Sequence, residues 1–190
     1  SGSLTTKIEK LIVDDSGDKL VILLNRQTNN LVVETLSKRT FSTITVSDPK
    51  SIERVAFSKA DPRFLTIVES PKAGVEEGQR LITTYVIEDE KLSCLEVLKV
   101  SPKTHFLEAN FPETYLCSQS ESGPAQLEVS YCKTFQRLLQ QNEGNLTLKQ
   151  FTRNFCFNLI TKRLSKALTE LKRIEKNFDL EDFWVSLFEK

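Results

Sequence analysis

The sequence predicts a mainly β fold, in which antiparallel four-stranded meanders are followed by a C-terminal helical segment. Three observations predict this fold. Ile8–Val13 is matched without a gap by Ile52–Phe57, 44 residues further along the chain. Residues 4–132 consist of short runs rich in Val, Ile, Leu and Thr, separated by turn sequences. From residue 133 the spacing of apolar residues changes from two to about three and a half, which is typical of a helix.

The first unit, residues 4–47, contains four predicted strands. They span residues 8–13, 19–25, 30–36 and 40–46. The segments between them include Asp-Ser-Gly-Asp, Gln-Thr-Asn-Asn and Ser-Lys-Arg. Because Asn, Asp, Ser and Gly favour tight turns, we expect the four strands to form one antiparallel meander.

The second unit, residues 48–101, repeats this order. Its predicted strands span residues 52–57, 63–69, 80–87 and 92–100. The match to the first unit continues without a gap beyond the first strand, so that Leu20 falls on Phe64 and Val21 on Leu65. An insertion at residues 72–78 lengthens the second turn, and we expect it at a solvent-exposed hairpin tip.

The third unit, residues 102–132, is the weakest of the three. Its predicted strands span residues 106–110, 114–118 and 126–132, and a fourth strand is not evident in the sequence.

The repeat period and the four-strand units resemble WD-repeat β-propellers, from residue 4 to about residue 132. A period of ~40 to 45 residues is the spacing of propeller blades. The signature residues of that family differ here, because His105 follows Thr104 instead of Gly and the only tryptophan, Trp184, lies in the helical segment. The resemblance implies blade-like sheets of an incomplete propeller. A β-sandwich or a barrel is the alternative architecture for the same pattern of strands.

Three blades are too few to close a propeller ring, which needs at least about four. An open stack of sheets leaves an apolar face and strand edges exposed, and proteins normally cover or pair such surfaces. Further blades, a partner protein, a second copy of the chain or its own helical segment could each cover this surface.

The helical segment, residues 133–190, contains a short first helix around Phe135 and Leu139 that stops near Gly144. A second predicted helix, capped by Asn145 or Thr147, turns Phe151 and Phe155 to one side. A third, residues 161–178, has an apolar stripe consisting of Leu164, Ala167, Leu168, Leu171, Ile174 and Phe178.

The last predicted helix follows Asp179 and carries five large apolar residues at helical spacing. These candidate partner-binding residues are Leu180, Phe183, Trp184, Leu187 and Phe188. Such a stripe can dock into a groove on a partner, or it can pack on its own domain. Truncation at Lys176 separates the two alternatives, since loss of folding indicates a core role and loss of a partner alone indicates a docking motif.

Basic residues concentrate in the third helix. The candidate nucleic-acid-binding residues are Lys162, Arg163, Lys166, Lys172, Arg173 and Lys176. Residues 1–131 hold 15 basic and 19 acidic residues, whereas residues 132–190 hold 11 basic and 7 acidic ones. A basic helix can contact phosphates, although the same charges also form the polar side of an ordinary amphipathic helix.

Chemistry-bearing residues are few. The one histidine, His105, is the only candidate general base, and we expect a surface or strand-edge imidazole. The four cysteines lack the closely spaced pairs of a structural zinc site. Cys94 and Cys117 lie in apolar, strand-like runs, so we expect buried reduced thiols and an intracellular protein, nuclear or cytoplasmic. We therefore expect no enzymatic activity, no metal and no cofactor.

The overall charge and hydropathy of the chain do not indicate a class of partner. The chain has 26 Lys plus Arg, 26 Asp plus Glu and 39% hydrophobic residues, with no run of the ~20 apolar residues that cross a bilayer. The chain contains no methionine, and Ser1-Gly2-Ser3 resembles a linker left by cloning, so residue 4 is expected to be internal to a longer protein.

These observations favour a non-catalytic scaffold or protein-interaction module that belongs to a large assembly. Divergent propellers with a helical extension occur in ribosome-assembly, trafficking and nuclear complexes, and the resemblance implies such a setting without choosing among them. A nucleic-acid-binding element based on the helix at residues 161–178 is the alternative function.

Overall fold

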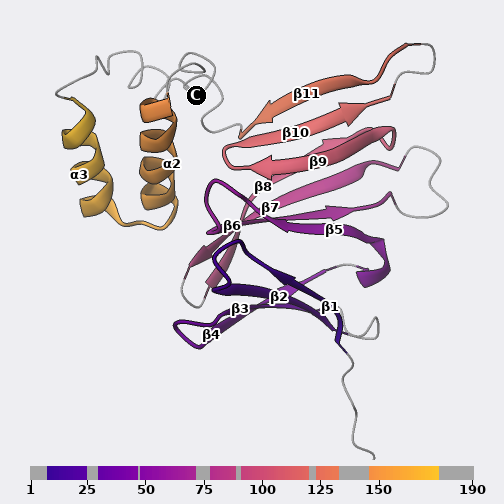
Figure 1. The fold of residues 1–190 in the computed structure, drawn as a ribbon, viewed down its shortest axis with the longest axis horizontal. Helices are drawn as coiled ribbons and strands as arrows, with labels where there is room; N and C mark the ends of the chain where they lie inside the picture. Colours follow the sequence, from indigo (N-terminus) through magenta and orange to yellow (C-terminus); the bar gives the residue numbers. More distant parts are fainter. Residues whose placement is uncertain are drawn as a thin grey trace, which may run out of the picture. The chain divides into compact units, whose positions relative to one another are not determined.

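A computed structural model describes residues 8–24, 30–46, 48–71, 78–88, 91–119, 123–132 and 146–175. The chain divides into two compact units, Ser1–Val129 and Ser130–Lys190, which we describe separately (Figure 1). The possible cloning linker, most of the insertion at residues 72–78, the short helix near residue 135 and the last helix lie outside the described residues.

The predicted β fold is confirmed. Three antiparallel sheets follow one another along the chain, and in each of them the strands lie in sequence order. The first sheet consists of β1 (Ile8–Val13), β2 (Lys19–Leu24), β3 (Asn30–Thr35) and β4 (Thr40–Thr45). After the short 3-10 helix η1 (Pro49–Ser51), the second sheet consists of β5 (Ile52–Phe57), β6 (Phe64–Glu69), β7 (Arg80–Glu88) and β8 (Lys91–Val100).

The third sheet has three strands in the described residues. They are β9 (Thr104–Asn110), β10 (Glu113–Ser118) and β11 (Gln126–Tyr131). The strand positions agree with the predicted ones to within two residues at each end, because turn residues border almost every strand.

The first strand of every sheet carries a β-bulge at a similar place. The extra residues are Glu9 in β1, Glu53 in β5 and Leu107 in β9. Since side chains alternate between the two faces of a strand, one extra residue reverses which positions share a face. Ile8 therefore lies on the same face as Leu11, and the repeated sequence also repeats this irregularity.

The ungapped match between the first two units is wrong beyond the first strand. Val13 pairs with Leu20, whereas Phe57 pairs with Leu65, so the structural equivalent of Leu20 is Leu65 and not Phe64. The cause is the turn between β5 and β6, which is one residue longer than the turn between β1 and β2.

Each sheet has two faces, which we call front and back, and both faces are apolar in the first and second sheets. The front face of the first sheet comprises Ile8, Leu11, Val13, Leu20, Val32 and Phe41. Its back face comprises Ile12, Val21, Leu31, Val33 and Ile44. The front face of the second sheet comprises the equivalent residues Ile52, Val55, Phe57, Leu65 and Ile67, and its back face comprises Ala56, Val68, Ile82, Leu98 and Val100.

Among the described residues of the β unit, hydrophobic cores form between consecutive sheets. The back face of the first sheet packs on the front face of the second. The back face of the second sheet packs in the same way on the front face of the third, which consists of Phe106, Ala109 and Leu116. The first strands also lie next to one another, because β1 contacts β5 and β5 contacts β9.

The second unit contains two described helices, α2 (Leu146–Ile160) and α3 (Leu164–Glu175). They pack through Phe151 and Phe155 of α2 and through Ala167, Leu171 and Ile174 of α3. Two residues of the predicted apolar stripe of the third helix, Leu164 and Leu168, are exposed among the described residues. The two helices here cover only part of that stripe.

The predicted helix at residues 161–178 begins too early. The Lys162 N–H donates to the carbonyl of Leu159 and the Arg163 N–H to that of Asn158, which is the bonding pattern of a Schellman motif. Lys162 has a φ of 56 degrees and occupies the left-handed position that ends α2. Lys162 and Arg163 therefore belong to the interhelical turn.

Candidate interaction surfaces

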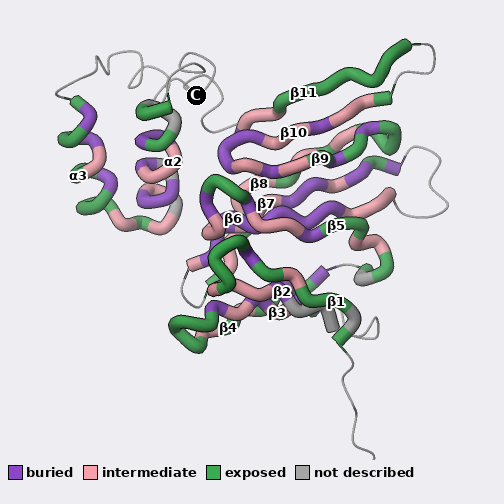
Figure 2. The backbone as a smooth tube through the Cα atoms, in the orientation of Figure 1, coloured by how far each residue is buried: buried purple, intermediate pink, exposed green. Residues whose placement is uncertain are grey.

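Within the β unit, no described residue packs on the front face of the first sheet. Leu11, Val13 and Phe41 expose 54%, 48% and 71% of their surface. The structural equivalents of the first two in the second sheet, Val55 and Phe57, belong to the packed core or lie against it. The same apolar face is thus buried once in the chain and open once, and β1 stands out as exposed in Figure 2.

The back face of the third sheet combines polar residues of β9 and β10, among them His105, Glu108 and Glu113, with exposed apolar residues of β11. The Ser118 hydroxyl donates to Glu128 at 2.8 Å, which places Glu128 on the front side of β11 and its neighbours Leu127 and Val129 on the back side. Leu127 and Val129 are 67% and 39% exposed. In addition β11 is the edge strand of its sheet, and Figure 2 shows most of its length exposed.

A buried arginine holds the second and third sheets together. Arg80, at the start of β7, donates from Nε and one terminal nitrogen to the carboxylate of the bulge residue Glu53, at 2.9 and 3.1 Å. Its other terminal nitrogen donates to the carbonyl oxygens of Pro102, at 2.8 Å, and of Thr104. The bulge in β5 and the turn before β9 are thereby fixed by one side chain.

Further contacts join β5 and β6 to the third sheet. The Arg54 guanidinium lies 5.3 Å from the centre of the Phe106 ring, and the Lys59 ammonium lies 3.2 Å from the Glu108 carboxylate. The ring of Phe64 stacks on that of Phe111 with centroids 3.7 Å apart. These contacts show how an occupied junction between sheets is built, with an apolar centre and charged residues at its rim.

A cavity of about 220 Å³ lies between the β1–β2 turn and the β5–β6 turn. Its polar lining consists of Asp14, Asp15, Arg54, Ser58 and Lys59. The Ser58 hydroxyl is buried without a hydrogen-bond partner. Because the cavity lining carries charges of both signs, it does not favour one class of ligand. These residues are better explained as solvated residues of the two turns.

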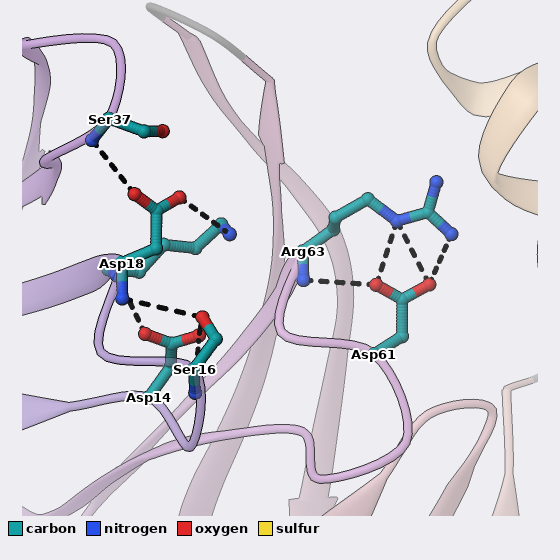
Figure 3. A network of polar contacts seen from close by, with 7 residues as sticks. Asp14, Ser16, Asp18, Ser37, Asp61 and Arg63 are labelled. Atoms are coloured by element: carbon teal, nitrogen blue, oxygen red, sulfur yellow. Dashed lines mark hydrogen bonds and ion pairs between the residues drawn. The ribbon is translucent and has the colours of Figure 1, made fainter.

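The carboxylate of Asp14 closes the first of these turns (Figure 3). It accepts hydrogen bonds from the Lys19 N–H, at 2.6 Å, and from the Ser16 hydroxyl. Burial raises the pKa of Asp14, but the hydrogen bonds from Ser16 and Lys19 outweigh burial and hold this pKa below its ordinary value of 3.8. Figure 3 also shows the carboxylate of Asp61 paired with Arg63 in the equivalent turn. Both acids have structural roles.

The expectation of buried thiols is wrong for Cys94. Cys94 is exposed, Cys117 is half-buried and Cys132 is buried. Cys94 lies on the outermost strand β8, so its side chain has no further strand beside it. Although Cys94 is exposed, the partial burial of its thiol raises the pKa and outweighs the hydrogen bond from the Glu96 N–H, which lowers it. The raised pKa keeps the thiol protonated and weakly reactive. His105 is exposed on β9, as expected.

The predicted basic residues divide between a turn and a helix. Lys162 is exposed in the interhelical turn, where Arg163 lies 5.4 Å from the centre of the Phe157 ring. Lys166 and Lys172 are exposed on α3. Arg173 is also exposed and forms an ion pair with Glu170 at 3.1 Å. Lys176 and the five apolar residues of the last helix, Leu180, Phe183, Trp184, Leu187 and Phe188, lie outside the described residues.

No protein-family model matches the chain, and a search of curated proteins found no similar sequence. Neither described helix is long and apolar enough to span a membrane. Within the described ranges no three His, Cys, Asp or Glu side chains are grouped as metal ligands.

Sequence reasoning predicted that a sheet face would be open but did not name its residues. The signal was present in the repeat, because Leu11 and Val13 align with Val55 and Phe57. The exposed apolar residues of β11 in the third sheet were missed. The alternation of Leu127 and Val129 with polar residues is typical of a half-buried strand and does not reveal which face has a neighbour.

Proposed function

We propose that the chain is a non-catalytic protein-interaction module, a scaffold subunit that contributes blade-like sheets to a larger assembly. One observation carries the proposal: consecutive sheets pack front on back, and within the β unit this order leaves the apolar front face of the first sheet open, with Leu11, Val13 and Phe41 exposed. Large exposed apolar faces mark interaction sites. The neighbouring first strands and the repeated bulge support blades of the propeller type.

The test is a capture experiment with charged substitutions on one face. The variant combining Leu11→Glu and Val13→Glu should lose the proteins that the unchanged chain retains from an extract of its source cells. Leu36→Glu is the matched control, because Leu36 is 43% exposed but lies in the β3–β4 turn. Equal capture by all three chains, or capture of nothing, contradicts the proposal.

The last predicted helix is a second docking element of the same module. A chain that ends at Glu175 should stay folded and lose a partner that the full chain binds. Loss of the cooperative unfolding transition in this shorter chain would instead assign Leu180, Phe183, Trp184, Leu187 and Phe188 to the core.

A nucleic-acid-binding element is the second candidate function, favoured by the exposure of Lys162, Lys166 and Lys172 on one small unit. Titration with RNA and DNA at two salt concentrations tests it, because log K falls by roughly 0.7 to 0.9 per released phosphate counterion for each decade of salt. Charge reversal of these three lysines together with Arg173 should abolish binding, whereas Lys38→Glu and Lys50→Glu in the β unit should not. Absent or salt-insensitive binding eliminates this function.

A further inference from the structure

Two charged positions recur at the edges of the sheets. The first position directly follows the bulge of the first strand, and its residues are Lys10 in β1, Arg54 in β5 and Glu108 in β9. The second position lies two residues beyond the end of the first strand, where β1 is followed by Asp15 and β5 by Lys59. We call these the bulge position and the turn position.

The turn position of one sheet and the bulge position of the next carry opposite charges at both junctions of the β unit. At the second junction the Lys59 ammonium lies 3.2 Å from the Glu108 carboxylate. At the first junction the equivalent residues, Asp15 and Arg54, line the same cavity with the signs reversed. Exposed charge pairs add little affinity, but opposite charges favour the correct partner and register.

The front face of the first sheet has the composition of the later half of such a junction. Leu11 and Val13 are exposed at its centre, and they are the equivalents of Val55 and Phe57, which lie against the back face of a sheet. Its bulge position is occupied by Lys10, which is also exposed. This face therefore combines an apolar centre with a basic residue at the rim.

We infer that this face docks another protein that presents the back face of a four-stranded antiparallel sheet, with an Asp or Glu at its turn position to pair with Lys10. The inference rests on the proposed function, since it names the partner of the same surface. A sheet is the expected occupant because a sheet covers the equivalent residues at both junctions of the β unit. The acid is expected because Lys10 has the sign of Arg54, whose counterpart is Asp15.

The size of the face determines how the contact can be detected. Strands lie about 4.8 Å apart and rise about 3.3 Å per residue. Each strand of the first sheet has 6 residues, so the face covers roughly 400 Å². The contact then buries on the order of 800 Å² in total, which is the range of weak complexes, and it is best trapped covalently.

Photo-crosslinking from the face itself identifies its occupant. Benzoylphenylalanine replaces Phe41, which is the most exposed side chain of the face at 71%, in the full chain. After irradiation in an extract of the source cells, mass spectrometry should place the adduct on a segment of another protein in which apolar residues alternate as in a strand. Leu36, which is 43% exposed in the β3–β4 turn, carries the same probe as a control and should not yield this adduct.

Charge exchange at the rim then tests the register with the identified protein in purified form. Lys10→Glu should weaken its binding about two- to fivefold, which is the effect of one exposed ion pair. Changing the acid at the partner's turn position to Lys should restore binding of the Lys10→Glu chain. Lys50→Glu, in the exposed part of η1, is the matched control and should bind as the unchanged chain does. Circular dichroism verifies that both variants are folded.

Other occupants of the face give different adducts. An adduct on the chain's own helical unit, or on a second copy in a mixture of isotope-labelled and unlabelled chains, overturns the inference. An adduct on a helix of another protein, no adduct at all, or an adduct without rescue by charge exchange overturns it as well. If the Leu11→Glu, Val13→Glu variant still loses its captured proteins in these cases, the proposed function stands and only the sheet as occupant fails.

Discussion

At the scale of single residues, carboxylates close the turns of the first sheet. The carboxylate of Asp14 replaces solvent for the N–H of Lys19 and for the hydroxyl of Ser16. The carboxylate of Asp18 accepts the N–H of Ser37 at 2.8 Å, and this bond is the main cause that lowers the pKa of Asp18. These acids fix the positions at which the strands reverse direction.

Asp14 should make stability depend on pH. Its pKa is lower in the folded chain than the ordinary 3.8, so the stabilisation is present above pH 3.8 and is lost as the pH falls through the folded value. We expect Asp14→Ala to lower the free energy of unfolding by about 1 kcal/mol at pH 7, with a difference that shrinks in acid. Thermal unfolding from pH 7 to pH 2 measures it. The exposed neighbour Asp15, changed to Ala, is the control, and a pH-independent difference would contradict the assignment.

Lys162 should be a site of stored backbone strain. It is a non-glycine residue in the left-handed region, with a φ of 56 degrees, at the end of α2. Glycine adopts this conformation without the Cβ clash, so Lys162→Gly should stabilise the helical unit by about 0.5 to 1 kcal/mol. Lys166→Gly, inside α3, should destabilise it by about 1 kcal/mol. Urea unfolding followed by circular dichroism compares the two, and the same sign for both would refute the turn geometry.

At the scale of elements, the bulge in β5 and the start of β7 are connected through Arg80 and Glu53. The Arg80 side chain is 9% exposed, and it also satisfies two carbonyl groups of the turn before β9. Removing a buried donor leaves these acceptors without a hydrogen bond, which costs more than the bond itself contributed.

We expect Arg80→Met to lower the free energy of unfolding by about 2 to 3 kcal/mol. Arg173→Met is the matched control, because Arg173 is exposed and its pair with Glu170 is worth under about 0.5 kcal/mol. Urea unfolding of both variants gives the comparison. Similar costs for the two arginines would show that the Arg80 contacts do not hold the sheets together.

Most elements could be predicted from the sequence because turn residues border the strands and apolar residues have the helical period. The bulges could not be predicted, since an extra residue such as Glu53 looks like any other strand residue. The end of α2 could not be predicted either. Thr161, Lys162 and Arg163 include no Gly or Pro, so the left-handed turn is imposed by the packing of α2 on α3 and not by local preference.

At the scale of the whole molecule, the repeat places the same apolar positions in two different environments. Val55 is buried by the first sheet, whereas its equivalent Leu11 is open. The sequence shows that Leu11 and Val55 are equivalent positions, but it does not show which of them is covered. A pattern of apolar residues indicates that a sheet face needs a neighbour and does not indicate which chain supplies it. The covered faces are those that lie between consecutive sheets, and the front face of the first sheet has no preceding sheet in the chain's described residues.

If a second copy, and not a different protein, supplies that neighbour, unfolding should depend on protein concentration. A ligand that binds only the folded state stabilises it by mass action, and for a dimer a tenfold rise in concentration adds about 1.4 kcal/mol per dimer. The urea midpoint of the unchanged chain should therefore rise by a few tenths of a molar between 1 and 100 μM, whereas that of the Leu11→Glu, Val13→Glu variant should stay constant. Val55→Ala should lower the midpoint at every concentration, because its core lies within one chain. A midpoint of the unchanged chain that does not move over this range would mean that its open front face is not joined to another copy.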